Sequence, residues 1–536
     1  DTQKPSLFPS ASHKTQLFRN RYNLIHQRLL RNEAFQKPTL RTTVTSLKRS
    51  HSGLDTLPQF YNLTCISNLL GRNGTNHLIL GLLTISPTDT LSINDLTGSI
   101  TLDLSHAKPI PEDGAWFTPG MIVLVDGTYV EEGSSNETVL SGSGGIGGCI
   151  GGKFVAFFVG GPPCERRKVS LGLSAPNEEG EITTGGEFGW VDFLGTGSER
   201  AVGSKMRKIE QKVFQSGSIN GKSNGRGRLV ILGEVNLDQP TTLQALKKIL
   251  GLYACESEED NPMAFVLMGN FVHHAVMARG GSGGSIEYKE SFDGLALILS
   301  EYPTLLQNAT FIFVPGDNDA WASAFGAGAA TTLPRRGVPE MFTSRIRRAF
   351  AVANAEAEKE LGRKTSGEAI WTTNPARLSV FGPMHEIVLM RDDMTSRFCR
   401  NAISFPPPRD VSAESGNKNM DMQQGRLNPE AINPKPCGIL QSIRKLVKPL
   451  LDQGYLSPFP LAQRPVHWDF ASALQIYPLP TALVLADGEA LAFTVTYEGC
   501  CVMNPGRLVI AGKKNVAGWV EYDLRTGNSI VREVQF

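Results

Sequence analysis

The sequence predicts a chain of mixed class, in which a β-rich domain precedes a larger α/β domain. Short apolar segments separated by turn residues fill residues 58–165, whereas apolar strands alternate with helices after residue 228. At 536 residues with 40% apolar content, the chain can bury more than one core. Its formal charge of +1 is too small for the chain as a whole to attract nucleic acid or anionic membranes, so any such binding must depend on a local cluster of basic residues.

Residues 1–57 are predicted to form a basic N-terminal helix followed by a linker. Between 15 and 35, Phe18, Tyr22, Ile25 and Leu29 share one helical face, with Arg and Asn on the other. A Thr/Ser-rich tether follows and reaches about residue 57. Residues 1–50 carry ten Lys/Arg against two acidic residues, which suits either a solvated linker or an arm that contacts phosphates.

Residues 58–165 predict a small β-barrel of the OB type. The expected strands are "HLILGLLTI", "LTGSITLDL", "GMIVLVDGTYV" and "KFVAFFVGG", with the glycine-rich 141–152 as a hairpin insertion. Binding of single strands would need exposed aromatics interleaved with Lys/Arg. We expect Phe154, Phe157 and Phe158 to lie in the core instead, which favours a structural role.

The rest of the chain predicts a polar connector or insertion at 166–227, with a helix at 204–214, and then an α/β domain at 228–536. Buried strands alternating with helices indicate βαβ units. The expected strands are 228–235, 264–270, 310–319, 377–382, 386–393, 482–488 and 491–506; the expected helices are 241–253, 291–302, 394–402 and 438–452, and 411–434 is a polar loop.

Polar residues follow the predicted strands at the edge of the sheet where α/β proteins bind ligands. They are Glu234, Asn236, Asn270, Asp317, Asn318, Asp319, Asp487 and Glu489. This layout resembles the calcineurin-like metallophosphoesterases, whose motifs are D-x-H, G-D, G-N-H-D/E and G-H-x-H. Here those positions are Glu-Val-Asn, Gly-Asn, Gly-Asp-Asn-Asp and Ala-Asp-Gly-Glu.

The resemblance therefore implies an inactive phosphoesterase domain with no catalytic, cofactor or metal residues. A two-metal site needs a bridging carboxylate and imidazole ligands, and none of the expected histidines is present. His273, His274, His385 and His467 fall at other positions. We expect Gly269 and Gly316 to permit tight turns, and Asp317 and Asp319 to cap the N–H groups of the segment that follows.

An OB barrel before a ligand-poor phosphoesterase domain resembles the B subunits of replicative DNA polymerases. The motifs that carry the resemblance are "GGPPCE", "GEVNLDQP", "LMGNF", "VPGDNDAW", "NPARL", "EIVLMRDD", "YPLP" and "NPG". The N-terminal helix and "VNLDQP" favour the epsilon branch over delta, which stays the alternative. The resemblance implies a nuclear, non-catalytic accessory subunit that binds the C-terminal zinc-bearing domain of the catalytic subunit of DNA polymerase epsilon and supports leading-strand DNA replication.

Three further expectations concern partners and location. DNA contact is expected only within the complex. Members of the epsilon branch join the replicative helicase through GINS by a small helical N-terminal domain, which we do not find before residue 15, so that contact is in doubt for this polypeptide. Eight scattered cysteines without a CxxC pair and the shortness of every apolar run predict an intracellular protein without a membrane segment.

Two other functions remain open from the sequence. One is an active metal-dependent phosphodiesterase that holds Mn²⁺ with Glu234, Asn270, Asp317 and Asp319. The other is an independent single-strand-binding module that acts through the barrel and residues 1–50.

Overall fold

The structure, a computed structural model, describes residues 10–36, 60–86, 89–111, 115–131, 149–171, 204–215, 227–257, 260–276, 284–320, 331–362, 367–382, 385–406 and 436–536. The linker 37–57, most of the connector 172–203 and 216–226, and the polar loop 411–434 lie outside these ranges. The chain divides into two compact units. No helix within the described ranges is long and apolar enough to cross a membrane.

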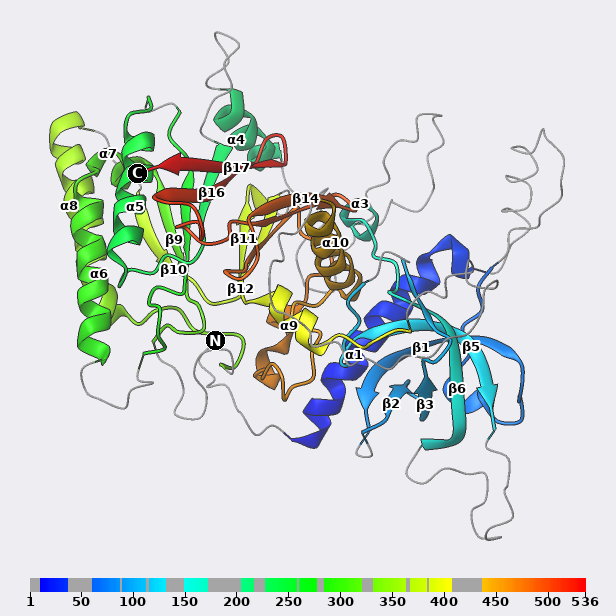
Figure 1. Cartoon of the computed structure of the whole chain (residues 1–536). Coiled ribbons are helices and arrows are strands. Elements are labelled where there is room, and N and C mark those ends of the chain that lie inside the picture. The colour runs from blue at the N-terminus through cyan, green and yellow to red at the C-terminus, as the bar shows by residue number, and fades with distance from the viewer. Residues whose placement is uncertain are drawn as a thin grey trace, which may run out of the picture. The chain divides into compact units, whose positions relative to one another are not determined.

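The first unit, Arg19–Pro163 with Asn401–Gln453, contains the predicted β-barrel (Figure 1). Its strands lie in the order β3-β2-β1-β5-β6-β4, and a parallel pairing of β3 with β6 closes the sheet on itself. Residues 401–453, which the sequence placed in the α/β domain, belong to this unit. The strands are β1 (Asn76–Ile85), β2 (Leu91–Asn94), β3 (Ser99–Asp103), β4 (Lys108–Ile110), β5 (Ile122–Val130) and β6 (Cys149–Gly160).

Helix α1 (Ala11–Arg31) packs on the barrel through Ile25 and Leu29, as its apolar face predicts. The arginines that we expected on its outer face behave differently. Arg21 and Arg28 are buried and donate to the backbone oxygens of Gly120 (2.9 Å) and Pro162 (3.3 Å). A buried guanidinium that already donates to carbonyl groups is not available to a phosphate, so these two residues stabilise the packing of α1 on the barrel.

Two 3₁₀ turns and one further helix complete the barrel unit. The turns are Glu33–Phe35 and Ile66–Leu69. Helix α10 (Pro436–Gln453) ends on the barrel, where the side chain of Gln453 accepts from the backbone N–H of Ile122 at 2.8 Å and donates to its carbonyl oxygen at 2.7 Å. A side-chain amide thus takes the place of a neighbouring strand at the start of β5.

The aromatic residues of β6 do not all lie in the core. Phe154 is buried as predicted, but Phe158 is 42% exposed, so the prediction of a core position is wrong for it. The strand register places Lys108 of β4 and Asp126 of β5 on either side of Phe158. One cation and one anion flank the exposed ring. The repulsion between Asp126 and a phosphate would therefore offset the attraction of Lys108.

The second unit contains two sheets (Figure 1). The first has the order β10-β9-β8-β7-β16-β17, and its first four strands are parallel, which confirms the predicted βαβ units. The strands are β7 (Arg228–Leu232), β8 (Ala264–Met268), β9 (Thr310–Val314), β10 (Glu368–Trp371), β16 (Val516–Asp523) and β17 (Asn528–Gln535).

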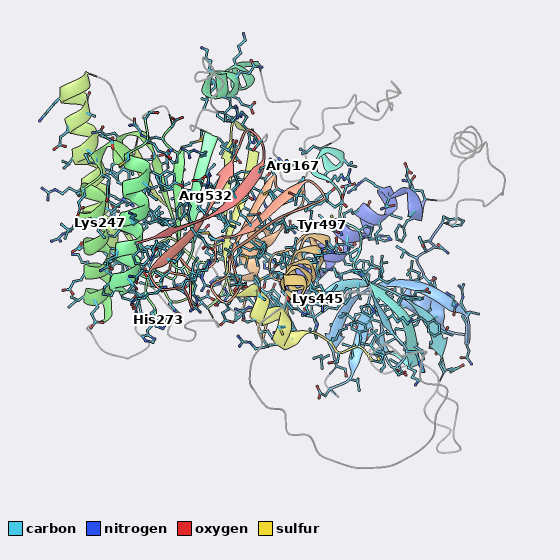
Figure 2. All side chains as sticks on the ribbon, turned by 45° about the horizontal axis from the view of Figure 1, so that its top comes forward. Arg167, Lys247, His273, Lys445, Tyr497 and Arg532 are labelled. Atoms are coloured by element: carbon cyan, nitrogen blue, oxygen red, sulfur yellow. The ribbon has the colours of Figure 1, made fainter. Side chains whose placement is uncertain are left out.

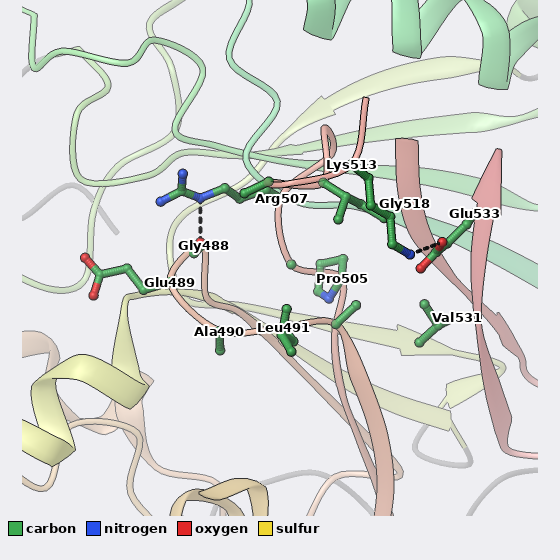
Figure 3. Close-up of a pocket in the computed structure, with 14 residues that line it drawn as sticks. Gly488, Glu489, Ala490, Leu491, Pro505, Arg507, Lys513, Gly518, Val531 and Glu533 are labelled. Atoms are coloured by element: carbon green, nitrogen blue, oxygen red, sulfur yellow. Dashed lines mark hydrogen bonds and ion pairs between the residues drawn. The ribbon is translucent and has the colours of Figure 1, made fainter. Parts of the chain in front are cut away.

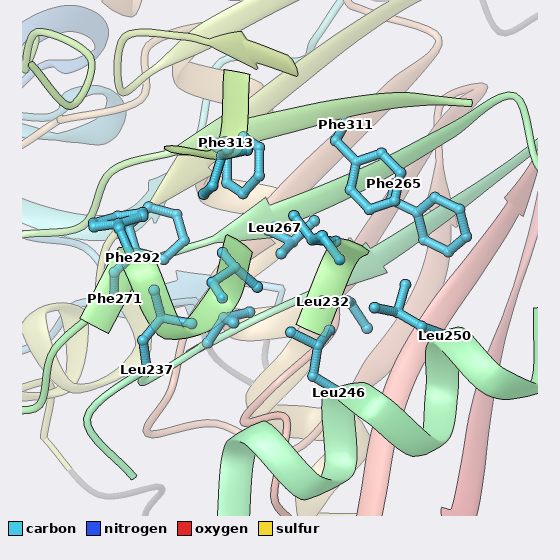
Figure 4. Close-up of a cluster of buried hydrophobic side chains, with 14 of the residues drawn as sticks. Leu232, Leu237, Leu246, Leu250, Phe265, Leu267, Phe271, Phe292, Phe311 and Phe313 are labelled. Carbon is cyan, nitrogen blue, oxygen red and sulfur yellow. The ribbon is translucent and has the colours of Figure 1, made fainter. Parts of the chain in front are cut away.

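Helices cover the outer face of this first sheet (Figure 1). Phe265, Phe311 and Phe313 from the strands pack with Leu246 of α5 and Phe292 of α6 in one buried cluster (Figure 4). The helices are α5 (Pro240–Ala254), α6 (Gly284–Ser300), α7 (Pro303–Asn308) and α8 (Glu340–Leu361). The sequence analysis does not predict α8. Its N-cap is Pro339, whose ring has no oxygen that can accept a hydrogen bond from the first turn, so the sequence carries no capping signal at this helix start.

The second sheet packs against the inner face of the first. Apolar residues of both sheets, among them Ile231, Val266, Ile387 and Val484, form one buried cluster between them. Its order is β11-β12-β13-β15-β14, with strands β11 (Ala376–Val380), β12 (His385–Arg391), β13 (Ala482–Ala486), β14 (Phe493–Tyr497) and β15 (Cys500–Asn504). Short helices α3 (Arg167–Ser170), α4 (Ser204–Gln215), α9 (Met394–Asn401) and the 3₁₀ segment Trp468–Leu474 complete the described elements.

Candidate functional site

The turns after β7, β8 and β9 meet at one edge of the first sheet, as the sequence predicts. The side-chain nitrogen of Asn270 lies 3.3 Å from Oε1 of Glu234, and the backbone N–H of Asn318 donates to Oδ1 of Asn270 at 3.0 Å. The turn after β13 reaches the same place, since a Cβ built on Gly488 would lie 2.7 Å from Cγ of Glu234. Four turns from two sheets therefore converge.

A buried arginine faces Glu234. Nε of Arg391 donates to Oε1 of Glu234 at 2.6 Å, and a second guanidinium nitrogen also contacts this oxygen. Nη1 of Arg391 lies 3.2 Å from Oδ1 of Asp393. Burial would lower the pKa of this guanidinium, but the carboxylates of Glu234 and Asp393 outweigh it and raise the pKa. Arg391 therefore stays charged between two carboxylates.

A second buried arginine faces Asp317. Nη2 of Arg464 donates to Oδ1 of Asp317 at 2.9 Å, and Nε of Arg464 lies 3.2 Å from Oδ2 of Asp392. Arg397 donates to the other oxygen of Asp392 at 2.7 Å. Burial raises the pKa of Asp317 and nearby Asp392 raises it further, against the opposing charge of Arg464. Burial also disfavours the charge on Asp392, but Arg464 and Arg397 outweigh this effect and lower its pKa.

Asp319 accepts hydrogen bonds from its own turn, from the turn after β8 and from helix α6. Its carboxylate accepts from the backbone N–H of Gly316 at 2.6 Å, from that of Phe271 at 3.0 Å and from the hydroxyl of Tyr288 at 3.1 Å. Burial raises the pKa of Asp319 to about 6, although these donors oppose the shift. The expectation of capping is therefore partly right for Asp319, which binds backbone N–H groups before it in sequence rather than after it.

The expectation of capping is wrong for Asp317, because its carboxylate is paired with Arg464. Desolvation of an unpaired charge costs several kcal/mol, and the two buried carboxylates offset this cost differently, Asp317 by a positive partner and Asp319 by donated hydrogen bonds. The sequence gives no sign of this partner, which lies 147 residues away.

The remaining predicted positions have local roles. The side chain of Asn236 donates to the backbone oxygen of Glu234 at 3.0 Å. Asp487 accepts from the backbone N–H groups of Thr395 (2.7 Å) and Glu489 (2.9 Å), and burial raises its pKa. The side chain of Glu489 is 47% exposed and lies 3.8 Å from Arg400. Asp487 thus organises its turn, and Glu489 faces solvent.

Two positions at this edge of the sheet require glycine because neighbouring turns approach each other closely there. A Cβ on Gly269 would lie 2.3 Å from Oδ2 of Asp319, and one on Gly316 would lie 2.3 Å from Oδ1 of Asn270. Neither residue has a positive φ. We expected these glycines to permit tight turns; their described geometry leaves no room for a side chain between two neighbouring turns.

His273 meets the convergent turns through its backbone, since its carbonyl oxygen accepts from the side-chain nitrogen of Asn318 at 2.9 Å. The side chains of His273 and His274 are exposed and meet edge to face, with ring centroids 4.7 Å apart (Figure 2 labels His273), and His385 contacts Glu210 at 2.9 Å. Within the described ranges, no group of three or more His, Cys, Asp and Glu side chains is arranged to hold a metal ion. The charges that face the carboxylates in this structure belong to arginines.

A surface cavity of about 670 Å³ is lined in part by residues 488–492, the segment that follows β13 (Figure 3). Its walls are mainly small and apolar, with Pro505 at its floor and Leu491 exposed at its rim. Nε of Arg507 donates to the backbone oxygen of Gly488 at 2.6 Å, and Lys513 is paired with Glu533. Arg507 therefore holds the turn that approaches Glu234, and the charge of Lys513 in the cavity wall is already paired.

The sequence reasoning missed Arg391, Asp392, Asp393 and Arg464. The first three directly follow the core of a predicted strand, in "EIVLMRDD", so the rule that ligands gather at strand ends could have found them. Arg464 lies in an irregular segment after α10, and no local pattern distinguishes it.

Comparison with known proteins adds sequence evidence. Residues 229–495 match the family described as the B subunit of DNA polymerase alpha/epsilon, and residues 11–163 match the OB-fold domain described as DNA polymerase epsilon subunit 2-like. A solved structure titled as a novel archaeal phosphodiesterase matches 57% of this chain and 99% of its own at 9% identity, with a TM-score of 0.24, which is too low to decide the fold.

Curated relatives match nearly the whole chain. The B subunit of DNA polymerase epsilon from Schizosaccharomyces pombe is 34% identical over 95% of this chain and 69% of the relative. The protein of the same name from Saccharomyces cerevisiae is 30% identical over 98% and 70%, and "DNA polymerase epsilon subunit 2" of Mus musculus is 27% identical over 95% and 74%. The predicted family resemblance is confirmed: the chain belongs to the family of DNA polymerase epsilon B subunits.

Proposed function

We propose that this chain is a non-catalytic subunit of DNA polymerase epsilon in the nucleus. In this role it binds the C-terminal zinc-bearing domain of the catalytic subunit and supports leading-strand replication. The names of its relatives support an accessory subunit of this polymerase. The pairing of Glu234 with Arg391 and of Asp317 with Arg464 supports the absence of catalysis.

The physical argument rests on what a guanidinium can and cannot do. A two-metal phosphoesterase needs cations with open coordination positions, which lower the pKa of a bound water and clamp the leaving oxygen. A guanidinium is a donor with no open coordination position, and its charge is fixed to the chain. Arginines that are paired with these carboxylates therefore neutralise their charge, but they cannot bind and activate a water molecule as a metal ion does.

Two other assignments receive less support. The relatives reported above are named for epsilon, which leaves the delta alternative without an observation in its favour. A metal-dependent phosphodiesterase would have to displace Arg391 and Arg464 from their carboxylates. The contact with the replicative helicase through GINS stays a prediction.

Co-purification with the catalytic subunit tests the proposal. The full chain and the catalytic subunit's C-terminal domain are co-expressed, and the complex is washed at rising salt. We expect a one-to-one complex that survives high salt, because stable interfaces between subunits bury large apolar areas that salt does not weaken. Two polypeptides that elute separately at low salt would overturn it. Arg464→Met with Asp317→Asn, expected to leave the interface alone, serves as a control for folding effects.

A further inference from the structure

Helices α6 and α8 carry an exposed apolar groove in the layer that covers the first sheet. The two helices run in the same direction (Figure 1). Tyr288 and Phe342, both near the helix starts, meet edge to face with ring centroids 5.1 Å apart, and Asp293 lies 3.4 Å from Arg345 further along. A cavity of about 410 Å³ lies between α6, α7 and α8. Its floor includes Ala296, Leu306 and Ala353, whose small or buried side chains allow a close approach.

Each edge of this groove carries a large exposed apolar side chain, Leu297 on α6 and Val352 on α8, and each helix exposes a second one nearer its start, outside the cavity lining. Leu297 and Ile286 of α6 are 68% and 61% exposed, and Met341 and Val352 of α8 are 58% and 48% exposed. Residues 286 and 297 are eleven apart, as are 341 and 352, which puts each pair on one side of its helix. Leu297 and Val352 are thus exposed on the two sides of one groove, and apolar residues gathered in this way mark interaction sites more often than single exposed residues do.

The charges along the groove are ordered. Arg345 is paired with Asp293, whereas Arg348 makes no ion pair within the described part of the chain. Glu356 lies eight residues further along α8, which is about 12 Å or two helical turns. A positive charge therefore lies near one end of the groove and a negative charge near the other, with Val352 between them.

We infer that this α6/α8 groove binds an amphipathic helix of another subunit of the polymerase assembly. The occupant carries an acidic residue opposite Arg348, a basic residue opposite Glu356 about two turns away, and apolar residues between them that meet Leu297 and Val352. A helix in a groove buries such a pattern through apolar anchors at positions i, i+3 or i+4 and i+7, and the charges set its register. The inference rests on the proposed function, because that function supplies the assembly.

Site-specific crosslinking in the assembled complex tests the inference. The photoreactive residue p-benzoylphenylalanine replaces Leu297 in the full chain, which is co-expressed with the other polymerase subunits and irradiated. The crosslinked peptide is identified by mass spectrometry. The matched control places the same residue at Leu252, which is 42% exposed on α5 and outside the groove. We expect position 297 to crosslink at least fivefold more efficiently, to a helical segment with an acid and a base about two turns apart.

A charge exchange then tests the register. Arg348→Glu should lower the crosslink yield at least fivefold, and changing the facing acid of the identified helix to lysine should restore it. A crosslink to this chain itself, to a second copy of it, or to a segment without that charge pattern would overturn the inference. So would a yield no higher than at position 252, or one that Arg348→Glu leaves unchanged. Co-purification with the catalytic subunit, measured in the same samples, shows separately whether the proposed function holds.

Discussion

Nη2 of Arg464 donates to Oδ1 of Asp317 at 2.9 Å, and both side chains are removed from solvent. The same guanidinium also faces Asp392, so one arginine neutralises two buried carboxylates that come from different sheets. A buried pair of this kind contributes little over an apolar replacement, but loss of one partner leaves an uncompensated charge. This asymmetry makes the site sensitive to single substitutions.

Replacement of Arg464 should destabilise the α/β unit strongly. Arg464→Ala leaves Asp317 and Asp392 without their common partner, and we expect a loss of about 3–5 kcal/mol in the free energy of unfolding, measured by urea titration. Arg400→Ala, at a side chain that is 73% exposed, should change stability by less than about 0.5 kcal/mol. Adding Asp317→Asn to Arg464→Ala should recover part of the loss. Strictly additive effects of the two substitutions would contradict this account.

The convergent turns should be inert toward phosphodiesters. Hydrolysis of bis(p-nitrophenyl) phosphate by the purified chain with added Mn²⁺ should not exceed that of a metal-only blank, and Asp317→Ala should give the same trace. The reason is that Arg391 and Arg464 occupy the carboxylates that a metal would need. Mn²⁺-dependent turnover that disappears in Asp317→Ala would instead establish a working site.

Alanine at Gly316 should be costly, because the added Cβ would lie 2.3 Å from Oδ1 of Asn270 and 2.8 Å from its backbone nitrogen. We expect a loss of about 1–3 kcal/mol by thermal or urea unfolding. Gly294, within helix α6, is the matched control, since a Cβ there meets no atom within 4 Å. Gly294→Ala should stabilise by up to about 1 kcal/mol through helix propensity. Equal effects at the two glycines would refute the role of close approach.

The pH dependence of stability should report on Asp319. Its pKa is about 6 in the folded protein, chiefly through burial, and near 3.9 in an unfolded chain. The folded state therefore favours the protonated acid, and this contribution is fully present below about pH 4 and is lost as the pH rises through about 6. The stability of the native chain relative to Asp319→Asn should fall by about 2 kcal/mol between pH 4 and pH 7. A difference that stays constant with pH would show that the carboxyl titrates normally.

We expect that the barrel does not bind single-stranded DNA in the absence of the other subunits. Phe158 is exposed, but Lys108 and Asp126 flank it with opposite charges, and Arg21 and Arg28 of α1 are buried. Fluorescence anisotropy with a labelled oligonucleotide at low salt should show no binding that Phe158→Ala weakens. Salt-dependent binding that is lost in Phe158→Ala would favour the single-strand-binding hypothesis, with Asp126→Asn as a variant that should strengthen it.

Regular elements and the convergent edge could be predicted from local pattern. The strands that contain Leu232, Leu267 and Phe313 appear as short apolar runs, and the residues after them gather at one edge because parallel strands end together. Helix α8 was missed because its start lacks a capping side chain. The exposure of Phe158 was missed because a short run of aromatics does not reveal which face of a strand is covered.

The sequence by itself determined the family and the mixed class, and it shows which polar residues follow the predicted strands, since each of these depends on residue identity and on spacing along the chain. Only the tertiary structure decided which residues face these carboxylates. Arg391 reaches Glu234 across 157 residues and Arg464 reaches Asp317 across 147, and no local pattern encodes such distances. A buried carboxylate is stabilised by a positive partner or by hydrogen-bond donors, and the fold determines which part of the chain provides them.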